Sequence, residues 1–177
     1  MRNNLIIGGA VLVLATMSAS AADNRGYTSG ELYRESELSV DAFGSASLGR
    51  YTLDHLSGSR IRHNTRLGAG VGLNYFFTQM IGIGADVYSE STSGAFIDSA
   101  SANLILRFPL GSGGFAPYAF GGGGHQFDGA EAWFAQLGGG LEYRFTPQAG
   151  MFFDARWVIP DETKYYGVAR LGLRFAF

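Results

Sequence analysis

Charged side chains interrupt the apolar stretches of this sequence, and they share one phase of an alternating pattern. Arg170 and Arg174, for example, alternate with Leu171, Leu173 and Phe175. Side chains of a strand point alternately to its two faces, so this pattern gives one charged face and one apolar face. Acids and bases in near balance on a shared face can form a buried ion network or line a narrow ion path. The candidates are Asp41, Asp86, Arg107, Glu142, Arg144, Asp154, Arg156, Arg170 and Arg174.

Other residue patterns that could support chemistry are weaker. Glycines at 68, 70 and 72, and the run 121–124, lie within alternating stretches, whereas a dinucleotide site needs a glycine turn that opens a helix. His55 and His63, with Asp54, lack the spacing of a metal site. The formal net charge of -2 gives no reason to expect nucleic acid. We therefore expect no cofactor, no metal and no nucleic-acid partner.

The charged face requires strands to position it, and the sequence contains eight alternating runs of about ten residues, the length that crosses a bilayer at a barrel tilt. The connections after even-numbered runs are short, and those after odd-numbered runs are longer and more polar. This sorting predicts an all-β fold, an eight-stranded antiparallel up-and-down transmembrane β-barrel with all loops at one end. The short connections are 78–79, 109–114 and 146–148, and the long ones are roughly 48–65, 89–94, 125–131 and 159–164. The fifth run, 115–124, is blurred by Pro117 and glycines.

Aromatic residues on the apolar face cluster at two levels. The larger group lies near the short connections and predicts an interfacial girdle there. A second group lies near the long loops. The first comprises Tyr75, Phe77, Phe108, Tyr143, Phe145, Phe175 and Phe177, and the second comprises Trp133, Trp157, Tyr165 and Tyr166.

The N-terminus has the features of an export signal. A basic start at Arg2 precedes an apolar run over 5–17 and small residues over 18–22, which predicts a cleaved signal peptide over 1–21. The alternative, an uncleaved anchor, is short of the roughly 20 apolar residues that a spanning helix needs. We expect a flexible lead-in over 22–35 and the barrel over 36–177. Without cysteine, no lipid acylation site or disulfide is available.

The last strand carries the motif Arg170-x-Gly172-x-x-Phe175-x-Phe177. With the alternation, the loop sorting and the signal peptide, the chain resembles the small outer-membrane β-barrels of Gram-negative bacteria, of the OmpA-type and OmpX-like kind. The resemblance implies an assembly signal at Arg170, Gly172, Phe175 and Phe177 that the barrel-assembly machinery reads. It also implies a monomer in contact with outer-membrane lipids, including lipopolysaccharide. We expect a structural or surface-interaction protein rather than an enzyme.

An eight-stranded barrel is just wide enough for side chains to fill. We therefore expect a filled lumen, in which Asp41 and Arg174 pair because the first and last strands meet. A small-conductance, porin-like channel along the same charges is the first alternative.

A lipid A-modifying enzyme is the second alternative. Within the resembled family such enzymes use His with Ser and an acid, and His125 is the tempting residue. However, Phe127 stands where the deacylase motif needs a serine.

The first long connection is basic, and it either is simply solvated or meets lipopolysaccharide phosphates or another polyanion. Its cationic residues are Arg50, Arg60, Arg62, His63 and Arg66.

Deletion of Phe177 tests the assembly signal. We expect the truncated chain to be exported normally but to reach the outer membrane in reduced amount, because the terminal aromatic is part of the motif. Immunoblots of periplasmic and outer-membrane fractions measure this. Unchanged outer-membrane levels would contradict the assignment.

Overall fold

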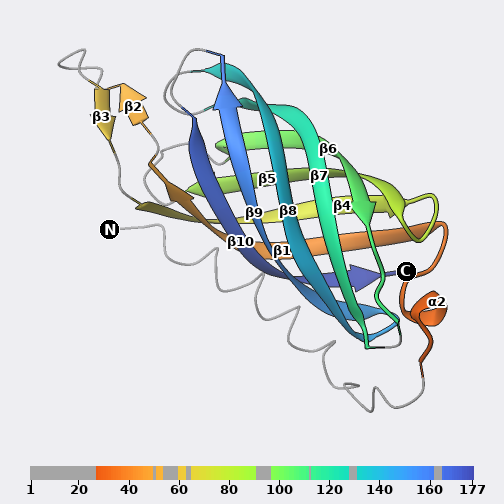
Figure 1. The fold of residues 1–177 in the computed structure, drawn as a ribbon. Coiled ribbons are helices and arrows are strands. Elements are labelled where there is room, and N and C mark those ends of the chain that lie inside the picture. The colour runs from red at the N-terminus through yellow and green to blue at the C-terminus, as the bar shows by residue number, and fades with distance from the viewer. Residues whose placement is uncertain are drawn as a thin grey trace.

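A computed structural model of the protein has a closed barrel of eight antiparallel strands (Figure 1). Going around the barrel, the order is β1-β10-β9-β8-β7-β6-β5-β4, and β4 returns to β1. The structure describes residues 27–49, 51–53, 60–62, 65–90, 97–111, 113–127, 131–161 and 165–177. The barrel strands are β1 (Glu37–Leu48), β4 (Thr65–Phe76), β5 (Ile81–Glu90), β6 (Ser99–Arg107), β7 (Phe115–Gln126), β8 (Ala132–Thr146), β9 (Ala149–Pro160) and β10 (Tyr166–Ala176).

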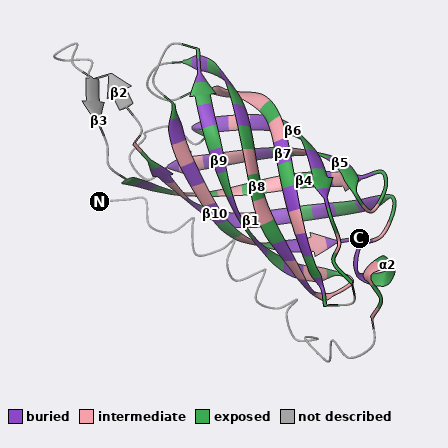
Figure 2. Ribbon diagram, viewed as in Figure 1, coloured by how far each residue is buried: buried purple, intermediate pink, exposed green. Residues whose placement is uncertain are grey.

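Burial follows the period-two pattern of the sequence. In β6, for example, Leu104 is 54% exposed while Arg107 is fully buried. Figure 2 shows the resulting stripes of buried and exposed residues along the strands. The exposed leucines, valines and isoleucines face outward, and the charged side chains face the lumen. The predicted fold, an eight-stranded antiparallel up-and-down barrel, is confirmed.

Three tight connections lie together at one end of the barrel, here called the short-turn end. The Thr78 hydroxyl accepts hydrogen bonds from the backbone N–H groups of Met80 and Ile81, at 3.2 and 3.0 Å. Thr146 repeats this arrangement between β8 and β9. Between β6 and β7, Gly114 has a φ of 72°, a left-handed conformation that favours glycine. These local bonds fix the hairpins and therefore the strand register.

The loop end, opposite, contains a feature that the sequence reading missed. The first long connection includes a small hairpin of β2 (Tyr51–Leu53) and β3 (Arg60–Arg62), whose strands pair antiparallel. Figure 1 shows this hairpin beyond the barrel wall, at the end opposite to the C-terminus.

Strand β7 is longer than its blurred pattern predicted. It continues to Gln126, so His125 lies within a strand and pairs with Trp133 of β8. The expected connection over 125–131 therefore begins two residues later. The glycines did not end the strand because its ladder bonds to β6 and β8 use only backbone groups.

The expected flexible lead-in also differs from the structure over residues 27–35. A one-turn helix, α2 (Ser29–Leu32), lies at the short-turn end (Figure 1). Leu32 and Tyr33 are buried against the barrel. Among the described residues, no helix has the length and apolar character needed to cross a membrane.

Outward aromatic side chains form contacts at both ends of the wall. At the short-turn end, Tyr75 packs edge-on against Phe77 at 5.1 Å. At the loop end, Trp157 lies 5.9 Å from Tyr165. Tyr166, which we expected in this second group, instead faces the lumen and is only 3% exposed. Strand β10 begins at this residue, and its even-numbered residues point inward.

Arginine substitutions at two depths test whether the outer wall faces lipid. Leu104 lies near the middle of β6, and Leu110 lies in the turn after it, with nearly equal exposed fractions of 54% and 57%. We expect Leu104→Arg to lower the free energy of unfolding by about 2–4 kcal/mol, because a charge at the bilayer midplane is costly. Urea titration of barrels refolded in lipid vesicles measures this.

Leu110→Arg is the matched control. It lies outside the strands, where a charge near the interface costs about 0–1 kcal/mol. Equal effects of the two substitutions would mean that the outer wall of β6 does not contact hydrocarbon.

Candidate functional site

The candidate site is the barrel lumen, where all nine sequence-predicted charged residues are buried. The seam between the first and last strands is one example. Asp41 of β1 lies opposite Arg174 of β10 in the strand register. Arg174 donates from Nε and Nη2 to the two Asp41 carboxylate oxygens, both at 2.7 Å. This two-pronged geometry is the strongest form of an arginine–carboxylate pair.

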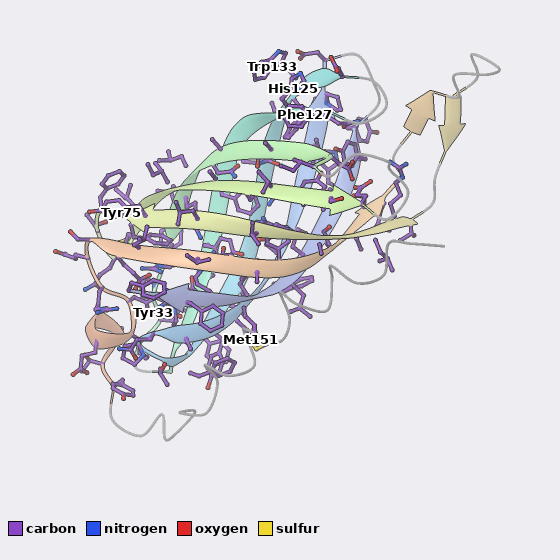
Figure 3. All side chains as sticks on the ribbon, turned by 180° about the vertical axis from the view of Figure 1, so that it is seen from behind. Tyr33, Tyr75, His125, Phe127, Trp133 and Met151 are labelled. Carbon is purple, nitrogen blue, oxygen red and sulfur yellow. The ribbon has the colours of Figure 1, made fainter. Side chains whose placement is uncertain are left out.

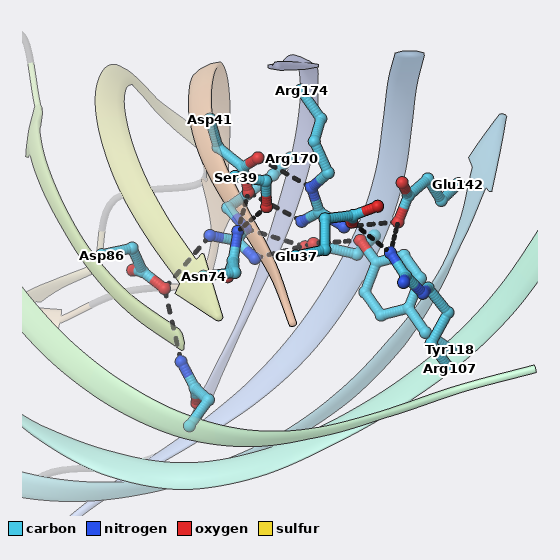
Figure 4. Close-up of polar contacts among 12 residues, drawn as sticks. Glu37, Ser39, Asp41, Asn74, Asp86, Arg107, Tyr118, Glu142, Arg170 and Arg174 are labelled. Carbon is cyan, nitrogen blue, oxygen red and sulfur yellow. Dashed lines mark hydrogen bonds and ion pairs between the residues drawn. The ribbon is translucent and has the colours of Figure 1, made fainter. Parts of the chain in front are cut away.

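Around this seam lies the short-turn network, with equal numbers of acids and arginines (Figure 4). Arg174 also donates to Glu142 at 2.5 Å, and Arg144 contacts Glu142 as well. Glu37 accepts from Arg107 at 3.0 Å and from Arg144 at 2.7 Å. The charges of this set cancel, as burial in a medium of low dielectric requires. Its members are Glu37, Asp41, Glu142, Arg107, Arg144 and Arg174.

A second set, the middle network, lies further along the lumen and also balances. Arg170 makes a two-pronged pair with Asp154, at 2.8 and 2.7 Å. It also lies 3.3 Å from Asp86, which Arg156 contacts at 3.2 Å. The Tyr118 hydroxyl donates to Asp154 at 2.7 Å. Two acids thus balance two arginines, and Asp86 contacts both of them.

Aromatic rings occupy much of the space between these charges. The Arg107 guanidinium lies 3.6 Å from the ring centre of Phe76, and that of Arg170 lies 4.7 Å from Phe43. Such stacking suits arginine because its planar cation is weakly hydrated. Glycine makes the room: a Cβ atom at Gly70 would come within 2.6 Å of the Phe43 ring. The inward glycines therefore leave space that large aromatic rings from other strands fill.

The nine predicted lumen residues did not include Glu37, nor an ion pair that lies outside the two networks. Arg66 donates to Glu90 at 3.2 Å, and the Ser47 hydroxyl donates to Glu90 at 2.5 Å. The signal for both was present, since Glu37 shares the phase of Asp41, and Glu90 shares that of Asp86. Both were missed because they lie at strand ends, beyond the runs that were recognised. Arg66, expected among the loop cations, faces the lumen instead.

Little space remains between the two networks. One cavity of about 20 Å³ has Asp41, Asp86, Arg170 and Arg174 among its lining residues. This volume suffices for about one water molecule, and the lining offers polar partners for it. Amide side chains add further bonds, as Asn74 donates to Asp41 at 2.9 Å. Side-chain hydrogen bonds and ion pairs therefore surround this cavity.

The remaining candidates lie elsewhere. The His125 ring faces outward at the loop end, 4.9 Å from both Phe127 and Trp133 (Figure 3). Its two ring neighbours are thus aromatic side chains. The described residues contain no cluster of three or more His, Cys, Asp or Glu suited to a metal ion. His55, His63, Asp54 and Arg50 lie outside the described residues.

The four residues of the expected assembly signal lie on both faces of β10. Phe177 is 64% exposed on the outer face, and Arg170 faces the lumen. The Phe177 backbone N–H donates to the Leu38 carbonyl at 2.8 Å, which extends the seam to the last residue of the sequence. A Cβ atom at Gly172 would come within 2.8 Å of the Phe152 ring. The motif glycine thus makes room for a lumen ring.

Removal of one charge from the seam tests the network. We expect Arg174→Met to lower the free energy of unfolding by about 3–5 kcal/mol, because Asp41 and Glu142 would stay buried with one partner fewer. Urea unfolding in vesicles, followed by tryptophan fluorescence, measures the change.

Two further variants control this experiment. Leu173→Met changes the neighbouring outward residue and should cost less than about 1.5 kcal/mol. Addition of Asp41→Leu to Arg174→Met removes the orphaned acid and should restore part of the loss. A stable single variant, or a double variant with simply additive losses, would show that the pair is not coupled.

Comparisons with known proteins find relatives only at the level of the fold. No family model and no curated protein matches the chain. The N-terminal β-barrel domain of Pseudomonas aeruginosa OprF superposes with a TM-score of 0.60 and 22% identity, over 81% of this chain and 98% of that one. Ail of Yersinia pestis, solved with the heparin analogue sucrose octasulfate, gives 0.55 and 16%, over 81% and 100%. A de novo designed transmembrane β-barrel gives 0.54 and 13%, over 81% and 98%.

These identities are too low to carry an activity from one protein to another. The designed barrel also shows that this architecture can be shared without a shared function, because it is not a natural protein. What the matches share with this chain is the β-barrel architecture. The chain has the fold of the small, eight-stranded transmembrane β-barrels of bacterial outer membranes.

Proposed function

We propose that this protein is an integral outer-membrane β-barrel with a lumen filled by side chains, and that its role is structural or one of surface interaction. The observation that carries the proposal is the pair of charge-balanced networks that occupy the lumen. A route for ions would need mobile water around the charges. Here the carboxylates of Asp41, Glu142 and Asp154 bond to arginines instead.

Three features support the outer-membrane location. The N-terminal sequence over 1–21 has the pattern of a secretory signal. The outer wall exposes a belt of large apolar residues such as Leu67, Leu104 and Leu137. The natural barrels that it resembles in fold are outer-membrane proteins. The partners would be outer-membrane lipids, including lipopolysaccharide, and the assembly machinery during insertion, with the barrel as a monomer.

The surface role would belong to the loop end. The β2–β3 hairpin includes Arg60 and Arg62 of the basic first long connection, and positive charge there would attract phosphate or sulfate groups. Lipopolysaccharide phosphates are the polyanions nearest to such a hairpin in an outer membrane. Ail, which shares the fold, has been solved with a sulfated sugar. We therefore favour polyanion contact over a purely mechanical role.

The two alternatives have less support. A channel would need a continuous path, whereas the cavity beside Arg170 and Arg174 holds about one water molecule. An enzyme that modifies lipid A would need a nucleophile beside His125, whose ring contacts Phe127 and Trp133. We accordingly propose neither a conducting nor a catalytic function.

Planar-bilayer recording tests the proposal. We expect the refolded protein to insert without discrete conductance steps, because its lumen charges are paired and its rings close the gaps. A heat-dependent shift in electrophoretic mobility verifies the barrel in the same sample, and a porin recorded in parallel verifies the bilayer. Discrete steps from the folded protein would favour the channel.

Incubation with lipid A tests the second alternative, an enzyme that modifies this lipid. The refolded protein is incubated with lipid A, and the lipid is weighed by mass spectrometry. We expect an unchanged mass. Loss or gain of an acyl chain would establish an enzyme and displace the proposed role.

A further inference from the structure

The segment before β1 crosses the short-turn end of the barrel and is built as a defined structure. In α2, the Glu31 carboxylate accepts hydrogen bonds from the backbone N–H and hydroxyl of Thr28, at 2.7 and 2.9 Å. These bonds hold the pKa of Glu31 below its ordinary value, so the capping charge persists. At Ser36 the chain turns into β1 with a φ of 54°. A left-handed serine is sparsely populated and persists only where its surroundings hold it.

Tyr33 fastens this segment to the barrel. Its side chain is fully buried, and its hydroxyl donates to the Gly114 carbonyl at 2.5 Å. Leu32 and Tyr27 pack in the same cluster with Ala116 of β7. Burial, with a smaller contribution from the Glu142 carboxylate, raises the pKa of Tyr33, so the hydroxyl remains a donor. A polar anchor and an apolar contact thus hold one turn of helix across the opening.

The Tyr33 ring also covers the first charges of the short-turn network. Its centre lies 4.7 Å from the Arg107 guanidinium and 5.3 Å from that of Arg144. The Arg107 guanidinium also lies near the Phe76 ring, at 3.6 Å, so two rings cover it. Glu37, Arg107 and Arg144 have no exposed side-chain surface. Charged groups at the mouth of a barrel are ordinarily the first to meet water, so this burial needs a cover.

We propose that residues 27–36 form a plug that seals the short-turn end of the lumen, with Tyr33 as the group that keeps water from the ion network. This inference rests on the proposed function, since a seal has meaning only in a barrel that separates two compartments. It adds a second closure, packed against the ion network, and assigns it to a segment outside the strands. Displacement of the plug would open the network to water from one end.

Thiol labelling tests the plug, because the chain has no cysteine of its own. Ser39→Cys places one thiol on the lumen face of β1, at a fully buried position. In the otherwise unchanged full chain, a charged methanethiosulfonate reagent should label it slowly. Tyr33→Ala should raise the rate by about tenfold or more, as expected when access no longer requires local opening. Leu32→Ala, a second route to a loosened plug, should raise it in the same direction.

Two matched variants separate the plug from general loosening. Tyr33→Phe keeps the ring but loses the bond to Gly114, so we expect a smaller rise than for alanine. Tyr75→Ala removes a tyrosine at the same end that faces outward (Figure 3), so we expect no change in rate. An equal rate in all variants, or fast labelling with the plug intact, would overturn the inference.

The heat-dependent mobility shift distinguishes failure of the plug from failure of the barrel. Rates are compared only among variants that keep this shift. Equal rates in shifted samples would refute the plug and leave the barrel proposal intact. Absence of the shift in the unsubstituted chain would refute the barrel proposal, and the plug with it.

Discussion

The ion pair between Asp41 and Arg174 joins the first barrel strand to the last across the seam that closes the barrel. The two residues face each other in the register of β1 and β10, and both are buried. A charge buried in a narrow lumen must find its partner there. A slip of one residue along the seam would turn Arg174 toward the lipid. Closure of the barrel and neutralisation of its interior are therefore one requirement.

The size of the lumen sets how that requirement is met. Eight strands enclose a space that side chains fill, so each large group needs a small one opposite. A Cβ atom at Gly138 would lie 2.5 Å from the ring of Phe120, as the one at Gly70 would lie close to Phe43. The rings in turn stack on guanidiniums such as that of Arg170. The glycines thus position the charges indirectly, because they leave room for the rings on which the guanidiniums stack.

The sequence predicted the wall well because a strand's period of two needs no tertiary information. Inward and outward residues could be assigned wherever a run was clean, as with Asp86 and Arg156. Prediction failed where the phase was lost. Glu37 lies just before a recognised run, and the phase of Tyr166 is unclear after the irregular connection that precedes it. Tyr33 gave no local signal, because its burial depends on Gly114, which lies 81 residues away.

The charged lumen still needs a physical reason. Buried ion pairs are often no more stabilising than apolar side chains of similar volume. In a membrane, however, a strand that is apolar on both faces would have no preferred orientation, since lipid and lumen would accept either face. Charges that pair inside the lumen determine which face of a strand points inward, in every strand that carries them. We infer that the networks serve to fix the orientation and register of the strands.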